Sequence, residues 1–457
     1  MTSAPIHSPI LPIAAIILAA GKGTRMRSDL PKVMHKIAAR PMIGHVLSMA
    51  IDIGLDPISV VIAPEQTTVQ NYARNLLPDV RIAYQNEQLG TAHAVRAAEA
   101  ALKDFEGHLV VLYGDTPLIR SSTVQMLIDA LSHDTKTAVA VLGFEPSDAA
   151  QYGRLILSDS GELLAIREYK DATEAERKVR LCNSGVMVLR GNIAWQLLAE
   201  IGNSNEKNEY YLTDIVEIAL HAGYVARVVK ADAEEVLGVN SRAELAIAEA
   251  YIQKRLRESA MEKGVTLIAP ETVFFCADTD IGRDVIIEPH VVFGEQVAIA
   301  DNVEIRSFSH IAGAVIESGS VIGPFARIRP GTTLGENSRV GNFVEIKKST
   351  IEAGAKISHL SYIGDAFIGE NTNIGAGTIT CNYDGYNKFK TTIGAGAFIG
   401  SNSALVAPVI IGQGAMIAAG SVITENVSDN ALALSRVQQS QKEDWAEIFR
   451  SKQISKK

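Results

Sequence analysis

An apolar residue at every sixth position between Ile281 and Ile423 constrains the fold more than any other feature of this chain. An α-helix repeats its apolar face about every 3.6 residues and a half-buried strand every two. A period of six over this length instead indicates a hexapeptide β-helix, in which each short strand forms one face of a stacked coil. The period is carried by three runs: Ile281, Ile287, Phe293, Ile299, Ile305, Ile311; then Ile316, Ile322, Ile328, Leu334, Val340, Ile346; and later Ile393, Ile399, Leu405, Ile411, Ile417, Ile423.

A glycine or another small residue often follows the apolar one, as at Gly323, Gly335 and Gly341. We expect it to let the backbone turn each corner without a Cβ clash. Three hexapeptides would close one coil, and coils would stack about 4.8 Å apart. The alternative is an ordinary β-sandwich with frequent glycine turns. The period fails at 382–390, where lysines and aromatic residues cannot enter a narrow core, so this segment is predicted to loop outward.

Composition restricts the class of protein. A chain of 457 residues is too long for one core, so two or three domains are expected. A net charge of −9 argues against a nucleic-acid partner. The three cysteines are scattered, which gives no zinc spacing or disulfide framework and favours a reducing compartment. No apolar run is long enough for a membrane span. We therefore expect a cytoplasmic protein.

The first half of the chain has a different pattern of apolar residues. Apolar β-type runs alternate with helical patterns, which predicts βαβ units and a mostly parallel, Rossmann-like sheet covered by helices. The expected strands are 13–18, 58–62, 109–113, 138–142, 186–189 and 225–229. The predicted organisation is a loose leader 1–12, an α/β domain 13–240, a helical linker 241–264 and the β-helix domain 265–457.

Two motifs in the α/β domain point to phosphate chemistry. The first strand runs into Gly21 and Gly23, which let backbone N–H groups face an anion, with Lys22 and Arg25 beside them. Asp115 follows an apolar strand, where open α/β sheets bind ligands and one carboxylate can hold Mg²⁺ against phosphate oxygens. The structural alternatives are a tight strand-to-helix turn for the first motif and a Gly-Asp turn for the second.

Two amide residues leave their roles open. Gln85 has a donor and an acceptor that could match the edge of uracil, or it could simply be solvated near a turn. Asn240 could complete a metal shell through its carbonyl oxygen, or it could be the N-cap of the following helix.

The string Leu-Ala-Ala-Gly-Lys-Gly-Thr-Arg-Met at 18–26, followed by Pro31-Lys32-Val33, resembles the signature of nucleoside triphosphate:sugar-1-phosphate nucleotidyltransferases. Over nearly its full length the chain resembles the bacterial bifunctional N-acetylglucosamine-1-phosphate uridyltransferase / glucosamine-1-phosphate acetyltransferase family. This resemblance implies UTP and Mg²⁺ at the first site, with Asp115 and Asn240 on the metal and Arg25 aiding catalysis. The residues it implies for nucleotide and sugar are Leu18, Ala19, Ala20, Gly21, Lys32, Gln85, Gly90, Thr91, Tyr113, Gly114, Asp115, Gly153, Glu168, Asn183 and Asn240.

The second half offers a base for acyl transfer. A sugar ammonium has no free lone pair, so transfer of an acetyl group to it needs proton removal by a group that titrates near neutrality. His359 lies near the broken register and the 382–390 segment, whereas His290 and His310 do not. The alternative is a polar surface histidine on the coil.

The same family resemblance extends through His-Leu-Ser-Tyr-Ile-Gly-Asp-Ala at 359–366 and Asn-Ile-Gly-Ala-Gly-Thr-Ile-Thr-Cys-Asn-Tyr-Asp-Gly at 373–385. It implies that His359 is the general base, that the coil is left-handed, and that three copies assemble through their β-helices with the site between them. The residues it implies for glucosamine-1-phosphate are Arg329, Lys347, Tyr362, Asn373 and Lys388, and those for acetyl-CoA are Ala376, Asn382, Tyr383, Ser401, Ala419 and Arg436.

The sequence thus predicts an enzyme that acetylates glucosamine-1-phosphate and then uridylates the product to UDP-N-acetylglucosamine, a cell-wall precursor. Two alternatives remain at this point. One is a single-activity sugar nucleotidyltransferase whose β-helix only assembles or regulates it. The other is a non-catalytic regulatory subunit built from the same two modules.

Overall fold

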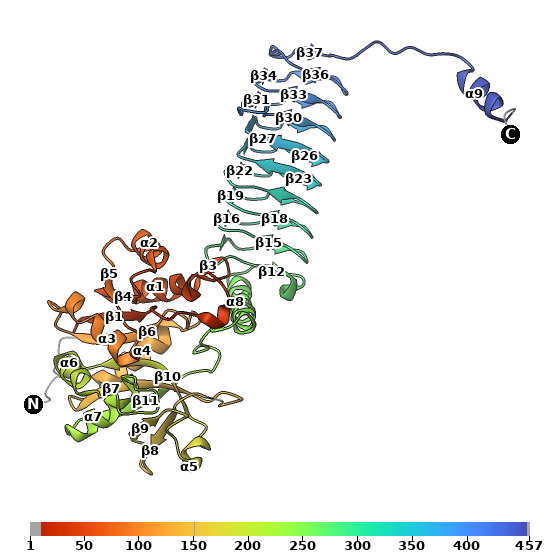
Figure 1. Cartoon of the computed structure of the whole chain (residues 1–457). Helices are drawn as coiled ribbons and strands as arrows, with labels where there is room; N and C mark the ends of the chain where they lie inside the picture. Colours follow the sequence, from red (N-terminus) through yellow and green to blue (C-terminus); the bar gives the residue numbers. More distant parts are fainter. Residues whose placement is uncertain (1–10, 150, 455–457) are drawn as a thin grey trace, which may run out of the picture. The chain divides into compact units, whose positions relative to one another are not determined.

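The computed structural model describes residues 11–149 and 151–454. The chain divides between Lys254 and Arg255 into two compact units. Figure 1 shows a helix-covered sheet in the first and a coil of short strands in the second. In the described residues, no helix has the length and apolar character needed to cross a bilayer.

The first unit is built on one mixed sheet with the strand order β11-β7-β10-β6-β1-β4-β5. Strands β5, β4, β1 and β6 run parallel, while β10 lies antiparallel between β6 and β7. The hairpin β8–β9 joins it through β10. The strands are β1 Ile13–Leu18, β4 Ile58–Ile62, β5 Arg81–Tyr84, β6 His108–Tyr113, β7 Thr137–Phe144, β8 Arg154–Leu157, β9 Leu163–Arg167, β10 Cys182–Leu189 and β11 Val225–Lys230, with a separate pair β2 Lys36–Ile37 and β3 Arg40–Pro41.

Both faces of this sheet are buried, as the apolar strand sequences require. In β1, Ala14 and Ile16 enter one core and Ala15 and Ile17 the other, because successive side chains alternate between faces. Helices α3, α6 and α7 pack on the first core and α1, α2 and α4 on the second. The helices are α1 Met42–Asp52, α2 Thr67–Leu76, α3 Thr91–Ala97, α4 Ser121–Ser132, α5 Glu174–Arg177, α6 Gly191–Glu200 and α7 Ile215–His221, with 3₁₀ turns η1 Thr24–Met26, η2 Lys32–Met34, η3 Ala100–Leu102 and η4 Leu212–Asp214.

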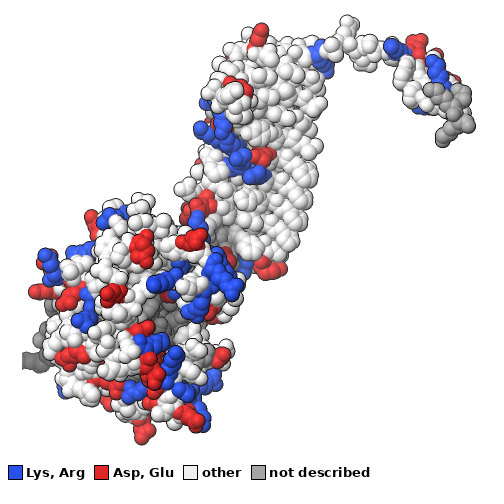
Figure 2. Space-filling view, viewed as in Figure 1, with Lys and Arg blue, Asp and Glu red and all other residues white. Residues whose placement is uncertain are grey.

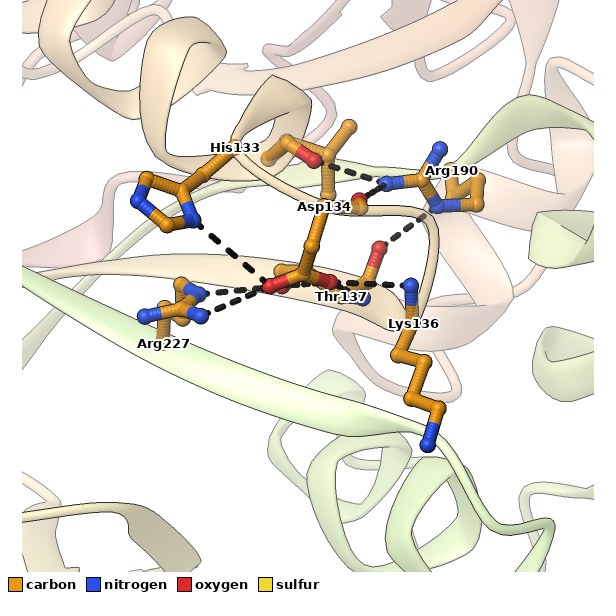
Figure 3. A network of polar contacts seen from close by, with 7 residues as sticks. His133, Asp134, Lys136, Thr137, Arg190 and Arg227 are labelled. Carbon is orange, nitrogen blue, oxygen red and sulfur yellow. Dashed lines mark hydrogen bonds and ion pairs between the residues drawn. The ribbon is translucent and has the colours of Figure 1, made fainter.

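A polar network closes the turn from α4 into β7 (Figure 3). Asp134 accepts hydrogen bonds from the backbone N–H of Lys136 at 2.8 Å and of Thr137 at 2.7 Å, and it pairs with Arg227 at 2.7 Å. Arg190 donates to three backbone carbonyls around the same turn. Arg190 thus lowers the cost of burying carbonyls at the sheet end, and no sequence motif pointed to it or to Arg227.

The long helix α8, Arg242–Glu262, follows a cap formed by Ser241. Ser241 Oγ accepts the N–H of Glu244 at 3.2 Å, and the Glu244 carboxylate accepts the N–H of Asn240 at 2.7 Å. Ser241 is therefore the capping residue. The N-cap alternative for Asn240 was thus wrong. Its side-chain carbonyl instead accepts a hydrogen bond from the Lys32 ammonium.

The second unit is a coil of three parallel sheets. Ile287 pairs with Ile305, and Ile305 with Ile322, so the chain returns to the same sheet after three hexapeptides. The first sheet contains β12 Thr266–Leu267, β14 Ile286–Ile287, β17 Glu304–Ile305, β20 Val321–Ile322, β23 Arg339–Asn342, β26 Lys356–His359, β29 Asn373–Ile374, β32 Phe398–Ile399, β35 Met416–Ile417 and β37 Leu432–Ala433.

The other two sheets have eight strands each among the described residues. The second contains β13 Asp280–Ile281, β16 Val297–Ile299, β19 Ala314–Ile316, β22 Thr332–Leu334, β25 Thr350–Ile351, β28 Ala366–Ile368, β31 Thr391–Ile393 and β34 Val409–Ile411. The third contains β15 Val292–Phe293, β18 His310–Ile311, β21 Arg327–Ile328, β24 Glu345–Lys347, β27 Tyr362–Gly364, β30 Ile379–Cys381, β33 Ala404–Val406 and β36 Val422–Ile423.

The period-six residues form one continuous core through this coil. The small residues that follow them have a different role from the expected one. A Cβ on Gly341 would lie 1.8 Å from the carbonyl oxygen of Ser358 in the next coil, and one on Gly335 would lie 2.7 Å from the N atom of Ala353. These glycines therefore permit close stacking of coils. Among the glycines named after the apolar residues, Gly323 does have a positive φ of 92°, and positive φ otherwise falls at other corner residues, including Phe308, φ 62°, and Asn337, φ 56°.

The segment 382–390 leaves the coil after Asn382, which is itself 6% exposed. An isolated bridge joins Tyr383 to Lys388, and residues 384–388 are exposed. The prediction of an outward loop is thus confirmed. A short 3₁₀ turn, η5 Pro270–Thr272, follows β12, and α9 Trp445–Ile454 follows the last strand.

Candidate active sites

A cavity of about 430 Å³ in the first unit collects most of the residues predicted to bind nucleotide. It lies at the carboxyl ends of β1 and β6, where parallel sheets bind ligands. Its lining includes Leu18, Ala19, Ala20, Gly21, Lys32, Gln85, Gly90, Thr91, Tyr113, Asp115 and Glu168. Residues from separate segments of the chain therefore meet in one place.

Lys32, Asp115 and Asn240 form a cation-binding group at this cavity. The Lys32 ammonium forms an ion pair with Asp115 and donates to Asn240 Oδ1 at 2.9 Å. The other amide atom of Asn240, Nδ2, donates to the Gly238 carbonyl at 3.2 Å, which fixes the direction of Oδ1. The Val239 N–H donates to the Asp115 carbonyl at 2.9 Å. The two oxygens therefore converge on one point, where a positive charge already lies.

The glycine loop is packed around the same lysine. Gly23 has φ of 61°, and a Cβ there would lie 2.6 Å from Lys32 Cβ. The exposed Arg25 follows on η1 and is not among the residues that line the cavity. Gly114 lies at the carboxyl end of β6, and its N–H donates to the Leu18 carbonyl at 2.9 Å.

A second loop forms the opposite wall. Gln85, 5% exposed, donates to the Gly90 carbonyl at 3.2 Å. Gly90 has φ of 116°, and a Cβ there would lie 2.5 Å from the Tyr210 carbonyl oxygen, so only glycine fits. Thr91 Oγ1 accepts the N–H of Leu212 at 3.0 Å. The loop is thus fixed to the segment before α7.

The remaining predicted residues of this site lie deeper in the sheet. The N–H of Asn183 donates to the Gly153 carbonyl at 2.8 Å, which places β10 beside the start of β8. A Cβ on Gly153 would lie 3.6 Å from Glu168 Oε1, so Gly153 and Glu168 are neighbours. Burial raises the pKa of Glu168, and nearby Lys207 partly opposes that rise. Burial also raises the pKa of Tyr113.

Several lining residues were missed by the sequence reading. Gln88 donates to the Ala20 carbonyl at 2.6 Å and so ties the two loops together. Lys207, Glu209 and Tyr211 reach the cavity from a segment that carries no motif. The only signal for them was an unusual density of charged and aromatic residues at 205–211.

In the second unit, His359 lies at a corner of the coil next to the outward loop. It is exposed, and its Nδ1 lies 3.2 Å from Oδ1 of Asn342 in the coil below. Because a carbonyl oxygen can only accept, Nδ1 carries the proton. The lone pair of Nε2 is then available to a substrate.

The residues predicted for acetyl-CoA continue along the same corner in successive coils. Gly377 N–H donates to the His359 carbonyl, and Asn402 N–H donates to the Ala376 carbonyl at 2.7 Å. In the coils beyond, the Ser401 carbonyl accepts from Gly420 at 2.8 Å, and Arg436 donates to the Ala419 carbonyl at 2.8 Å. Residues 359, 376, 401, 419 and 436 thus follow one another in successive coils.

Two cationic side chains lie close together on this unit. Lys347 and Lys388 lie close enough that Lys347 lowers the pKa of Lys388. Tyr362 acts on the pKa of Lys388 in the opposite direction to Lys347. The side-chain amide of Asn382 donates to the Asp365 carboxylate at 2.5 Å. Figure 2 shows Lys and Arg side chains gathered partway along the coil, on a face otherwise poor in charge.

The other predicted residues of this site lie near that group but have separate contacts. Arg329 pairs with Glu345 at 2.7 Å, and Glu345 lies opposite Tyr362 in the next strand. Asn373 begins β29 opposite Lys356. The Tyr383 hydroxyl donates to the Gly385 carbonyl within the outward loop.

Neither site contains a dense metal cluster. In the described part of the chain there is no group of three or more His, Cys, Asp or Glu side chains that could hold a metal ion. A cation at the first site would therefore depend on Asp115, Asn240 and oxygens supplied by a ligand.

Family models match both halves of the chain. The model of the MobA-like NTP transferase domain matches residues 15–180. The model of the GMPPB C-terminal domain matches residues 310–383, and that of the bacterial transferase hexapeptide (six repeats) matches residues 390–425. A solved structure of CMP:2-keto-3-deoxy-manno-octonic acid synthetase complexed with CTP is 19% identical, with a TM-score of 0.41, over 53% of this chain and 99% of that one.

Full-length relatives are much closer. The bifunctional protein GlmU of Zymomonas mobilis subsp. mobilis is 54% identical over 97% of this chain and 99% of its own. That of Azorhizobium caulinodans is 55% identical over 96% and 97%, and that of Paramagnetospirillum magneticum 53% over 97% and 98%. Identity at this level, sustained across the α/β domain and the β-helix alike, shows that this chain belongs to the family of the bifunctional protein GlmU.

Proposed function

We propose that this protein acetylates glucosamine-1-phosphate with acetyl-CoA at its β-helix and transfers uridylyl from UTP to the product at its α/β domain. The observation that carries this proposal is the presence of two separate constellations, each with the groups its own reaction needs. The first has a carboxylate and an amide oxygen near a glycine loop, and the second has a histidine and a pair of neighbouring lysines.

Uridylyl transfer needs alignment and neutralisation of charge rather than a covalent intermediate. The phosphate of N-acetylglucosamine-1-phosphate attacks the α-phosphorus of UTP, and pyrophosphate leaves. The backbone around Gly21, with Lys32 and Arg25, binds the phosphates. Gln85, Gly90 and Thr91 bind the uridine, and Gly153, Glu168 and Asn183 bind the sugar.

The residues at this site fit Mg²⁺. Asp115 and Asn240 direct a carboxylate and an amide oxygen to a point that already attracts a cation, Lys32. Hard oxygen donors, few in number, suit a Mg²⁺ that also binds substrate phosphates. When bound, Mg²⁺ neutralises negative charge on the phosphates. Asp115 and Asn240 would hold it, and Lys32 would bind a phosphate oxygen.

Acetyl transfer needs a base for the amine. Nε2 of His359 removes a proton from the sugar ammonium, and the amine nitrogen then attacks the thioester carbonyl. Coenzyme A leaves as the thiol after proton return. Lys347, Lys388 and Arg329 bind the sugar phosphate, and Tyr362 and Asn373 the sugar. Asn382 and Tyr383 begin the acetyl-CoA site.

The assembly proposed for the β-helix is a homotrimer. A row of exposed rings supports it: His290, Phe308, Phe325 and Phe343 stack at 4.9 to 5.1 Å between centroids, and Leu360 follows in the next coil. Phe325 is 45% and Phe343 55% exposed. An apolar row of this kind favours burial against a second copy. A Phe325→Ser variant should then weaken the assembly in sedimentation equilibrium, whereas an unchanged mass would reject this surface.

Two variants of the full chain test the two activities. Asp115→Asn should abolish uridylyl transfer and leave acetyl transfer intact. His359→Ala should do the converse. If His359→Ala retains acetyl transfer, another base acts. If the wild type does not acetylate glucosamine-1-phosphate, the single-activity nucleotidyltransferase is the better assignment.

A further inference from the structure

The nucleotide cavity contains one contact that no motif suggested. The side chain of His93, in the first turn of α3, approaches the buried amide of Gln85, with 3.2 Å between His93 Nδ1 and Gln85 Nε2. His93 is not among the cavity-lining residues, so it reaches the cavity only through Gln85.

The neighbours of Gln85 fix the orientation of its amide. The Gly90 carbonyl oxygen lies 3.2 Å from one amide atom, and a carbonyl can only accept, so that atom is Nε2. The same Nε2 faces His93 Nδ1, so Nδ1 also accepts, and the proton of His93 is on its Nε2. Both N–H bonds of the amide are thereby used within the protein.

This arrangement leaves Gln85 Oε1 for a ligand. In the part of the chain that the structure describes, no protein group donates to Oε1. A bare acceptor on a residue that is only 5% exposed selects a base edge that carries an N–H. Uracil presents an N–H at N3, whereas cytosine presents a lone pair there.

We propose that His93 is a specificity-positioning residue. It holds Gln85 with Oε1 toward the base and so favours a uracil nucleotide over a cytosine nucleotide. This inference rests on the proposed uridylyl transfer. Without the His93 acceptor, only the Gly90 carbonyl holds the amide, which can then rotate more readily so that Nε2 faces the base, where it would serve cytosine.

The His93 segment is well supported, which makes a local test feasible. The Ala92 N–H donates to the Tyr210 carbonyl at 2.9 Å, and the Tyr210 N–H donates to the Leu89 carbonyl at 2.7 Å. Substitution at His93 should therefore leave the loop in place and change only the freedom of Gln85.

The test compares kcat/KM for UTP and CTP in the full chain. His93→Leu removes the acceptor, and we expect the UTP/CTP ratio to fall about tenfold, the effect of one oriented hydrogen bond. The loss should fall on KM for UTP rather than on kcat. His93→Asn keeps an acceptor oxygen near the position of Nδ1 and should restore most of the ratio. Arg96→Leu, one turn further along α3, is the matched control and should keep the ratio.

Fluorescence of Trp195, which lies in the same unit as His93, reports whether each variant is folded. A folded His93→Leu protein with an unchanged UTP/CTP ratio would overturn the inference. So would a His93→Asn protein no better than His93→Leu. If the wild type does not use UTP, the proposed function fails as well, which separates the two results.

Discussion

Lys32 and Asp115 form an ion pair in which the lysine side chain is 12% and the aspartate side chain 18% exposed. The same ammonium donates to Asn240 Oδ1. These are the two oxygens proposed to bind Mg²⁺, so lysine and metal cannot use them at the same time.

We therefore expect Lys32→Met to bind Mn²⁺ more tightly than the wild type when no nucleotide is present. Removing a competing positive charge should lower Kd between about 5- and 150-fold, the usual size of a coupling between two bound groups. Free Mn²⁺ measured by electron paramagnetic resonance checks this. Lys22→Met, in the same loop but exposed, should not change Kd. Unchanged binding in Lys32→Met would contradict the competition, and Mn²⁺ binding that survives Asp115→Asn would contradict the metal site itself.

The proximity of Lys347 and Lys388 gives a second prediction. Two neighbouring cations bind a dianionic phosphate through charge-assisted hydrogen bonds, which are stronger than hydrogen bonds between neutral groups. Lys388→Met should thus lower kcat/KM for glucosamine-1-phosphate by roughly 10- to 100-fold, mainly through KM. Lys356→Met, exposed on β26, is the charge-matched control. A Lys388→Met enzyme with normal KM would place the phosphate elsewhere.

The contact between Asn342 and His359 gives a third prediction. Asn342 orients the imidazole so that Nε2 faces outward. Asn342→Ala should lower kcat of acetyl transfer about tenfold, the value of one net hydrogen bond, with KM nearly unchanged. Asn342→Asp retains an acceptor and should recover most of the rate. Equal losses in both variants would indicate a structural role only.

The network around Asp134 should stabilise the first unit. Arg227 and the N–H groups of Thr137 and Lys136 hold the pKa of Asp134 well below its usual range. Asp134→Asn should lower the free energy of unfolding by about 1–3 kcal/mol at pH 7. Because the folded-state pKa is depressed, the difference should shrink as pH falls below about 4. Asp129→Asn, on the exposed side of α4, is the control in denaturant unfolding.

Buried histidines should make the first unit sensitive to mild acid. Burial lowers the pKa of His45 from 6.5 to about 4, and burial also lowers the pKa of His35 and His108. The unfolded chain takes up protons first, so stability falls as pH drops from about 6.5 toward 4, by at most about 1.4 kcal/mol per pH unit for each group.

His45→Gln should flatten part of this slope, since Gln can still donate to the Ile37 carbonyl that now accepts from His45 at 2.9 Å. Fluorescence of Trp195, followed during urea unfolding at pH 5 and 7 in a Trp445→Phe background, measures it. An identical slope in both proteins would mean that His45 is not the group responsible.

The sequence alone determined the periodic parts of this protein. Period six required an apolar core stacked through short strands, and the buried residues from Ile287 to Ile423 form that core. Alternation of apolar runs required a covered sheet, and the predicted strands at 13–18 and 58–62 are β1 and β4. Local patterns of this kind survive folding because each residue's face is set by its own neighbours. The family resemblance was confirmed by relatives 53–55% identical.

Only the tertiary structure decided which distant residues meet. It brought Asn240 to Lys32 and gave the helix cap to Ser241, a choice that the sequence left open. It carried Lys207 and Tyr211 into the nucleotide cavity and His93 to Gln85. The physical reason is that strand order and loop paths set these contacts, and neither leaves a periodic trace along the chain.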